Sequence, residues 1–140
     1  MIELTSEFGR AVKRHLESEY VIWLTTVDSN LMPQPRPVWF IWEKDSFLVF
    51  SQAKAYKVRH IAKNPSVALH FNSDEKADKH VIIFIGQASI DANSPPAYQV
   101  SAYFKKYESG IADLNMTPEE FSREYSVAIR IRPTEMRGWE

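Results

Sequence analysis

Three prolines alternate at positions 33, 35 and 37, directly ahead of the apolar and aromatic residues 38–42. Proline has no backbone N–H, and in an extended chain alternate N–H groups point to the same edge. This segment therefore suits neither a helix nor the middle of a sheet, and we expect a stiff strand with one incomplete edge. Two interpretations stay open at this point: an edge strand protected from aggregation, or a platform on which a flat ring lies.

The rest of the chain carries repeated strand signals. Residues 20–27, 34–43 and 47–51 are rich in β-branched and aromatic side chains and are separated by turn residues, which predicts an antiparallel meander. Further strands are predicted for residues 67–71, 80–92 and 126–132. Residues 81–85 are all apolar, so we expect both faces of that strand to be covered, and Gly86 predicts a bulge or a close backbone approach.

Four helices are expected between these strands. Apolar residues recur at helical spacing in residues 5–18 and 54–64. Pro95 and Pro96 open a third helix, and Thr117-Pro118-Glu119-Glu120 is a capping box that begins a fourth, running to about residue 125. Strands and helices do not alternate regularly, so we predict a mainly β fold: six antiparallel strands forming a barrel with flanking helices, with residues 1–140 as one domain.

Composition excludes several classes of function. The chain has no cysteine, which excludes a disulfide scaffold, a thiolate nucleophile, a zinc finger and an iron–sulfur site. Lys and Arg number 17 against 18 Asp and Glu, so no basic excess points to nucleic acid. The four histidines show no metal-ligand spacing, and the four glycines make no phosphate loop. With no signal-like or membrane-spanning apolar segment, we expect a cytoplasmic protein that has no metal site.

A phosphate site is one interpretation of the segment around Ser51. This serine ends a predicted strand, and a predicted helix carrying Lys54 and Lys57 follows at once. Unpaired amides at a helix N-terminus, a hydroxyl and an ammonium group together suit a phosphate monoester. A capped surface helix with solvated lysines is the alternative.

Aromatic residues are numerous for a chain of this length, with four Trp, six Tyr and eight Phe. They either fill a β-rich core or line a subunit interface or a ligand pocket. No nucleophile or paired acid and base is recognisable, so the catalytic residues stay unassigned. If the protein is an enzyme, a bound cofactor carries the chemistry.

The run Arg36-Pro37-Val38-Trp39-Phe40-Ile41, the strand ending at Ser51 and the following Lys57 together resemble a known superfamily. It is the split-barrel flavoproteins typified by pyridoxamine 5′-phosphate oxidase, and within it the short deazaflavin (coenzyme F-420) dependent enzymes. The likeness extends over nearly the whole chain, through residues 24–40, 51–70 and 125–139.

The resemblance implies a six-stranded split barrel of the FMN-binding type that works as a homodimer, with FMN or coenzyme F-420 held at the subunit interface. It implies an oxidoreductase that passes hydride between the ring and a small organic acceptor. The residues it assigns to cofactor binding are Arg36, Pro37, Val38, Trp39, Phe50, Ser51, Lys57 and, from the partner subunit, Trp139.

Three points stay open at this stage. The end of the chain, MRGWE, lacks the tail that would hold pyridoxamine phosphate, so we do not expect that oxidase activity. The deazaflavin carries an acidic tail, and a groove lined by Arg10, Lys13, Arg14 or Lys54 would favour it over FMN. The alternative function is a non-catalytic module that binds a cofactor or haem, since a fold does not fix a function.

Overall fold

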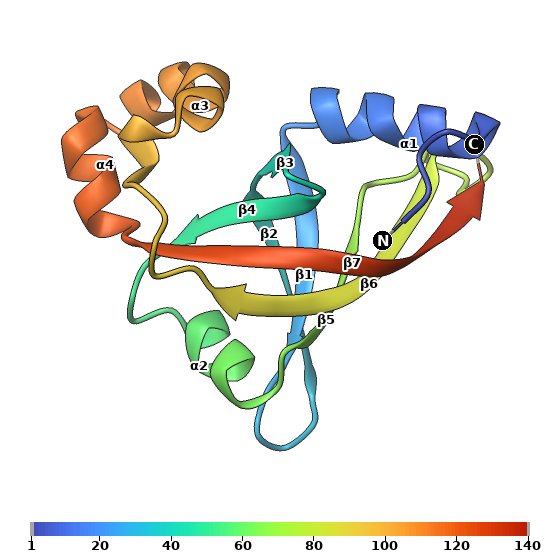
Figure 1. The fold of residues 1–140 in the computed structure, drawn as a ribbon, viewed down its shortest axis with the longest axis horizontal. Helices are drawn as coiled ribbons and strands as arrows, with labels where there is room; N and C mark the ends of the chain where they lie inside the picture. The colour runs from blue at the N-terminus through green and yellow to red at the C-terminus, as the bar shows by residue number, and fades with distance from the viewer. Residues whose placement is uncertain (1, 140) are drawn as a thin grey trace.

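A computed structural model describes residues 2–139, which form one curled antiparallel sheet with helices at its two ends (Figure 1). The elements follow in the order α1 (Glu7–Ser18), β1 (Val21–Val27), β2 (Pro33–Trp39), β3 (Ile41–Glu43), β4 (Ser46–Ser51), α2 (Tyr56–Lys63), β5 (Ser66–His70), β6 (Val81–Ile90), a 3₁₀ turn η1 (Ala97–Gln99), α3 (Ser101–Asp113), α4 (Pro118–Glu124) and β7 (Val127–Trp139).

The mainly β class is confirmed, but the expected number of six strands is wrong: within residues 2–139 the sheet has seven, in the order β2-β1-β5-β6-β7-β4-β3. The difference arises at Phe40, where the single strand predicted for residues 34–43 bends. Its first half, β2, pairs with β1 at one edge of the sheet, and its second half, β3, pairs with β4 at the other edge. One bent segment thus supplies both edges of a half-barrel.

Strand β2 is an edge strand, as its prolines predict. Its register with β1 is continuous, from Val21 opposite Trp39 to Val27 opposite Pro33. Proline nitrogens cannot donate to β1, so an unbroken ladder requires that positions 33, 35 and 37 turn their nitrogens to the open edge.

The two longest strands, β6 and β7, cross the whole molecule (Figure 1). Gly86 lies at a shift of register between them, which confirms the predicted bulge. A Cβ at this position would lie 2.6 Å from the Arg132 carbonyl oxygen, so the close backbone approach needs glycine. The last strand, predicted for residues 126–132, continues to Trp139 because its C-terminal half pairs with the start of β6.

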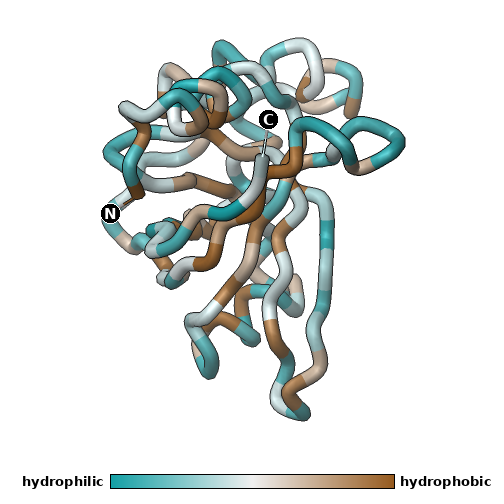
Figure 2. The backbone as a smooth tube through the Cα atoms, turned by 90° about the vertical axis from the view of Figure 1, so that its right-hand side faces the viewer, coloured by the Kyte–Doolittle hydropathy of each residue, from teal (hydrophilic) through white to brown (hydrophobic). Residues whose placement is uncertain are grey.

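Apolar residues form two clusters, one on each side of the sheet around β4 and β7. The first fills the concave side and includes Phe40, Phe47, Phe84 and Ile129. The second joins α3 and α4 to the outer side through Leu48, Phe50, Tyr103, Tyr107 and Phe121. The helices mix hydrophobic and hydrophilic residues along the chain (Figure 2), as expected for helices that cover a sheet with one face.

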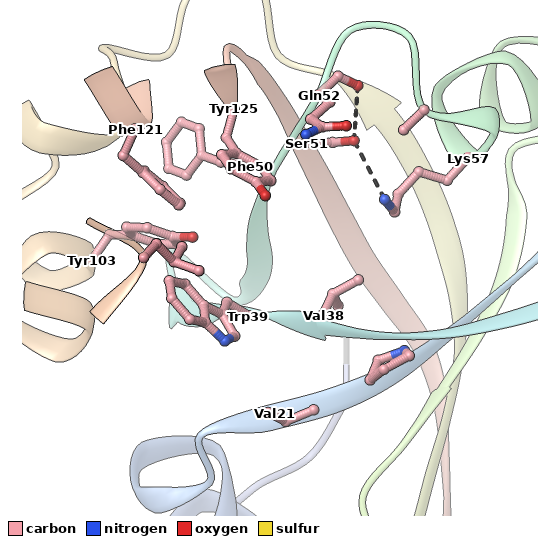
Figure 3. A pocket seen from close by; sticks show the side chains of 13 residues that line it. Val21, Val38, Trp39, Phe50, Ser51, Gln52, Lys57, Tyr103, Phe121 and Tyr125 are labelled. Carbon is pink, nitrogen blue, oxygen red and sulfur yellow. Dashed lines mark hydrogen bonds between the residues drawn. The ribbon is translucent and has the colours of Figure 1, made fainter. Parts of the chain in front are cut away.

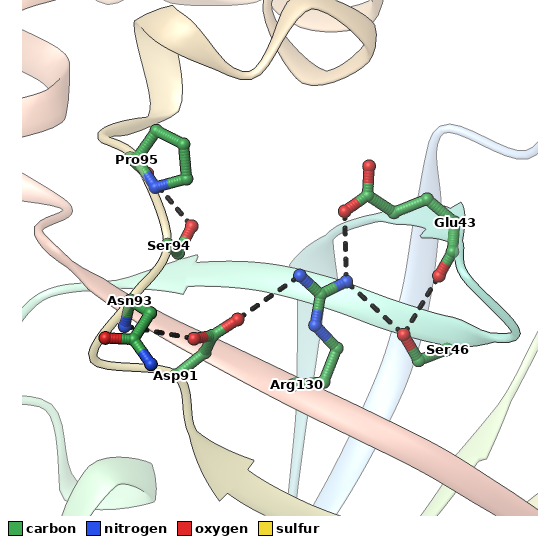
Figure 4. Close-up of polar contacts among 7 residues, drawn as sticks. All are labelled: Glu43, Ser46, Asp91, Asn93, Ser94, Pro95 and Arg130. Atoms are coloured by element: carbon green, nitrogen blue, oxygen red, sulfur yellow. Dashed lines mark hydrogen bonds and ion pairs between the residues drawn. The ribbon is translucent and has the colours of Figure 1, made fainter.

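A polar network centred on Arg130 adjoins the second cluster, since Arg130 pairs with Leu48 of that cluster across β7 and β4 (Figure 4). The buried guanidinium group of Arg130 on β7 donates to Glu43 at 3.1 Å, to the Ser46 hydroxyl at 3.3 Å and to Asp91 at 3.3 Å. It therefore joins β3, β4 and the segment that follows β6.

The other helix and strand predictions hold with three corrections. Residues 81–85 alternate between buried and half-buried, so one face of β6 is covered and not both. The helix expected from residue 54 begins at Tyr56, and the one expected at Pro95 is split into η1 and α3. The capping box at Thr117 and Glu120 is confirmed.

Candidate functional site

A cavity of about 440 Å³ opens between the edge strand β2 and strand β4, beside α3 and α4 (Figure 3). One part of its wall is apolar and largely aromatic, and the other part carries polar and cationic side chains. The lining residues are Val21, Pro37, Val38, Trp39, Phe50, Ser51, Gln52, Ala55, Lys57, Tyr103, Leu114, Phe121 and Tyr125.

The aromatic wall is built from rings that fix one another. Phe121 stacks on Tyr125 with ring centroids 4.5 Å apart, and it lies 5.8 Å from Trp39 at a shallow angle. Phe50 meets Tyr103 edge to face at 4.8 Å. Tyr103 is fully buried, and burial raises the pKa of its hydroxyl above the ordinary value, so this hydroxyl stays neutral. A wall of interlocked rings is a rigid surface for a flat, apolar ligand.

Helix α3 holds the bend that positions Trp39. The Tyr107 hydroxyl accepts the Phe40 N–H at 2.8 Å and lies within donating distance of the carbonyl oxygens of Tyr20 and Phe40. The Lys106 ammonium group donates to the same Phe40 carbonyl at 2.8 Å and lies 3.9 Å above the Phe40 ring. The backbone groups that the bend removes from the sheet are thus paired by side chains of α3.

The polar part of the cavity lies where β4 ends and α2 begins. The Lys57 ammonium group lies 3.4 Å from the Ser51 hydroxyl, and no side chain caps the N-terminus of α2 at Ala55. Burial, and secondly the charge of Arg36, lower the pKa of Lys57. Within residues 2–139 neither Lys57 nor Arg36 forms an ion pair with a carboxylate. Two neighbouring cations without a counter-charge suit an anionic ligand group.

Arg36 itself borders a second cavity, of about 500 Å³, that adjoins the first. The two cavities share Pro37, Ala55 and Lys57. The remaining walls of the second are Thr26, Asp28, Gln34, Arg36, Tyr56 and His60.

The structure brings six of the eight residues expected at the site into one cavity: Pro37, Val38, Trp39, Phe50, Ser51 and Lys57. Arg36 lines the adjoining second cavity. Trp139 lines neither of these two cavities; it is exposed at the end of β7, opposite Val81. Sequence reasoning missed the wall from α3 and α4, namely Tyr103, Leu114, Phe121 and Tyr125. The aromatic residues of the predicted third helix were the available signal.

The basic residues considered for an acidic tail do not reach this site. Arg10, Lys13 and Arg14 line a separate hollow along α1, which shares no residue with the first cavity. Lys54 is exposed and borders neither cavity. Within the single chain, these residues therefore do not line an exit from the first cavity.

Comparisons with known proteins agree with this architecture. The family model described as pyridoxamine 5′-phosphate oxidase matches residues 8–140. No match was found among curated protein sequences. No helix within residues 2–139 has the length and hydropathy of a membrane span.

Solved structures with similar folds include three of different description. A conserved hypothetical protein from Mycobacterium tuberculosis is 17% identical, over 97% of this chain and 85% of that one, with a TM-score of 0.77. An F420 reductase is 25% identical, over 89% and 94%, with a TM-score of 0.67. HutZ, a haem storage protein from Vibrio cholerae, is 16% identical, over 98% and 95%, with a TM-score of 0.65.

Proposed function

The chain belongs to the pyridoxamine 5′-phosphate oxidase family, and from that membership we propose that it is an oxidoreductase whose cofactor, FMN or coenzyme F-420, occupies the cavity between β2 and β4. When bound, such a ring exchanges hydride with a small organic acceptor. The similarity to an F420 reductase supports this class of activity.

One observation carries the proposal: a rigid aromatic cavity continues directly into a cluster of cations that has no carboxylate partner among residues 2–139. Trp39, Phe121 and Tyr125 supply the apolar surface. Ser51, Lys57 and the neighbouring Arg36 supply a hydroxyl and two positive charges. A planar ring joined through a short polar chain to a phosphate has the same distribution of apolar and anionic groups.

The residues of this chain have three tasks in the proposal. Lys57, Ser51 and Arg36 bind the phosphate. Pro37, Val38 and Phe50, from the edge strand β2 and from β4, lie along the ring. The aromatic wall from α3 and α4 excludes water from the ring face, which strengthens electrostatic contacts inside the cavity.

Storage or transport of haem is the second candidate, because HutZ shares the fold. Haem iron is held by His, Cys, Met or Tyr. Among residues 2–139, those that line the first cavity include no His, Cys or Met, and of these four types only Tyr is present, as Tyr103 and Tyr125. Burial raises the pKa of Tyr103, which disfavours the tyrosinate that would bind iron. The donor set therefore favours a flavin or a deazaflavin.

We also propose that two copies of the chain form the working unit. The outward face of the sheet carries the cross-strand row Trp23, His70 and Ile83, which is only half-buried. A second copy would cover this face and supply Trp139 of the partner subunit to the cavity. Sedimentation velocity at micromolar concentration tests this: a dimer is expected, and a monomer overturns it.

The test of function is a titration with FMN and with coenzyme F-420, followed by tryptophan fluorescence and by the absorbance of the ligand. We expect one or both to bind and Lys57→Ala to weaken binding at least tenfold, because a charge-assisted contact contributes roughly 1.5 to 3 kcal/mol. Lys54→Ala is the matched control, since Lys54 is exposed nearby and borders neither cavity. If neither ligand binds, or if both variants behave alike, the proposal is wrong.

A further inference from the structure

Tyr103 on α3 is a buried polar residue whose hydroxyl has no hydrogen-bond partner within residues 2–139. The residue is only 1% exposed, and its ring is held by Phe50, Tyr107 and Phe121 at centroid distances of 4.8, 4.8 and 6.3 Å. Burial of a hydroxyl without a partner costs stability, so phenylalanine would serve the packing alone better than tyrosine does. The hydroxyl therefore points to a contact with a ligand.

The Tyr103 hydroxyl faces the first cavity. Tyr103 lines that cavity, and Figure 3 shows its side chain reaching from α3 toward the interior with the oxygen foremost. This oxygen has no partner, yet it is not among the polar atoms that the described residues enclose completely. The small exposure that Tyr103 keeps is therefore exposure to the cavity, where an atom of a ligand can reach the hydroxyl.

Tyr107, one turn further along α3, shows the opposite arrangement. It is also buried, but its hydroxyl accepts the Phe40 N–H at 2.8 Å and lies 2.7 Å from the Tyr20 carbonyl oxygen. Positions four apart lie on the same face of a helix. The face that α3 turns to the sheet thus carries one hydroxyl that the backbone uses and one that the protein leaves unused.

The unused hydroxyl is a neutral hydrogen-bond donor. Burial first, and then the neighbouring tyrosines Tyr107, Tyr125 and Tyr20, raise the pKa of Tyr103, so its proton stays on the oxygen. In a cavity that excludes water, such a donor stabilises an oxygen atom on which negative charge develops.

The wall around Tyr103 selects for shape and against charge. Among residues 2–139, the wall from α3 and α4 consists of three aromatic residues and one aliphatic residue, none of them charged: Tyr103, Leu114, Phe121 and Tyr125. Stacked and edge-to-face rings favour a flat ligand. A ligand that satisfies both the wall and the hydroxyl is planar, uncharged and carries an oxygen that accepts a hydrogen bond.

We propose that Tyr103 is a catalytic hydrogen-bond donor to the acceptor, and that the acceptor is a planar, uncharged compound whose reducible bond is a carbonyl group or is conjugated to one. This inference rests on the proposed function, in which the ring lies along Pro37, Val38 and Phe50 and leaves the wall from α3 and α4 to the acceptor.

The chemistry of the acceptor gives the hydroxyl its role. The acceptor gains a hydride from the reduced cofactor, which is thereby oxidised by two electrons. A C–H bond forms at the electrophilic carbon, the carbonyl π bond breaks, and an electron pair moves to the carbonyl oxygen. Tyr103 donates to that oxygen as it becomes negative, and a proton from water then neutralises it. The hydrogen bond is strongest where the charge is largest, so it accelerates the hydride transfer.

The kinetic test uses the protein loaded with the reduced form of whichever of FMN and coenzyme F-420 binds more tightly. The acceptors are 1,4-naphthoquinone and benzalacetone, both planar, uncharged conjugated carbonyl compounds, and reduction by free cofactor is subtracted. We expect Tyr103→Phe to lower the saturating single-turnover rate about a hundredfold and to change the half-saturating concentration by less than about threefold. Tyr98→Phe removes an exposed hydroxyl outside the cavity and, as the matched control, should leave both values unchanged.

A binding test examines the hydroxyl without turnover. In the protein loaded with oxidised cofactor, 4-nitrophenolate imitates a planar acceptor with charge on its oxygen, and 4-nitroanisole is the uncharged counterpart. We expect Tyr103→Phe to weaken 4-nitrophenolate at least tenfold and 4-nitroanisole less than about twofold, because only the first receives a charge-assisted hydrogen bond. Without ligands, Tyr103→Phe should unfold at the wild-type temperature or above, since the hydroxyl that it loses has no partner.

The outcomes that overturn the inference differ from those that overturn the proposed function. Equal single-turnover rates for the wild type and Tyr103→Phe, or equal weakening of 4-nitrophenolate and 4-nitroanisole, exclude Tyr103 as the donor. An unfolding temperature of Tyr103→Phe well below that of the wild type means that the hydroxyl serves the fold. If the wild type reduces neither acceptor, the carbonyl class is wrong. If neither FMN nor coenzyme F-420 binds, the proposed function fails, and this inference fails with it.

Discussion

The rings of Trp39 and Tyr107 lie parallel, 4° apart in orientation, with centroids separated by 4.5 Å. Trp39 is the last residue of β2 and lines the first cavity, whereas Tyr107 is buried in α3 and pairs the backbone at the bend after Trp39. The shape of the cavity is therefore set by a helix that follows β2 by some sixty residues in the chain.

Tyr107→Phe tests the polar half of this relationship. The variant keeps the ring stack but leaves the Phe40 N–H without its partner, and an unsatisfied buried group costs about 1 to 3 kcal/mol. Urea unfolding is expected to show a loss of stability in that range. Tyr98→Phe, in which an exposed hydroxyl is lost, is the control and should change the free energy of unfolding by less than about 0.5 kcal/mol. Equal effects would mean that the bend does not depend on Tyr107.

Gly110→Ala tests how closely α3 approaches Trp39. A Cβ at this position would lie 2.3 Å from the Tyr20 hydroxyl and 2.9 Å from Cη2 of Trp39. Alanine favours a helix by about 1 kcal/mol over glycine, so an isolated helix would gain stability. Crowding typically costs about 1 to 3 kcal/mol, and we expect a net loss of stability with a shifted tryptophan emission maximum. Ser109→Ala, on the exposed side of α3, should be neutral or stabilising; a gain from both variants would contradict the close approach.

Lys106 gives a pH dependence of defined sign. Burial, opposed by the charge of Glu19, lowers the pKa of Lys106 from 10.5 to about 8. Between pH 8 and 10.5 the unfolded chain holds this proton and the native protein does not, so the contribution of Lys106 to the free energy of unfolding rises with pH across that window. Below about pH 8 both states hold the proton, and this contribution no longer changes with pH. Neutral or charged, the amine keeps a donor for the Phe40 carbonyl.

The measurement for Lys106 is urea unfolding of the wild type and of Lys106→Met at pH 7.5, 9 and 10.5. Tyrosine titration affects both proteins, so the difference between them isolates Lys106. We expect this difference to shift in favour of the wild type as pH rises. A difference that is flat with pH would show that the ammonium group is fully solvated.

Arg130→Met tests the polar network in Figure 4. Glu43 and Asp91 would lose their shared cation in a half-buried position, and removal of one partner from a buried ion pair typically costs about 3 to 5 kcal/mol. Since these carboxylates are partly exposed, we expect about 3 kcal/mol by urea unfolding. The triple variant Arg130→Met, Glu43→Gln, Asp91→Asn should recover most of the loss, because no uncompensated charge is left. A single variant within about 0.5 kcal/mol of wild type would mean that solvent, and not Arg130, balances the carboxylates.

Local signals in the sequence fix much of this fold. The prolines at 33, 35 and 37 place β2 at an edge, Gly86 marks the bulge, and Thr117 with Glu120 begins α4. The same holds for the polar part of the cavity, because Ser51 and Lys57 lie on either side of one short connection between β4 and α2. These features depend on backbone chemistry and on neighbours only a few residues apart.

The count of strands, the aromatic wall and the second cavity depend on contacts between distant residues. Phe40 bends because Tyr107, 67 residues away, pairs its N–H, and Arg130 reaches Glu43 from 87 residues away. His60 lies within hydrogen-bond distance of Thr26, 34 residues away in the chain, and both residues line the second cavity with Lys57. Hydrophobic periodicity specifies which face of an element is buried but not which other element covers it. That choice is made when all the apolar faces pack together, so only the tertiary structure contains it.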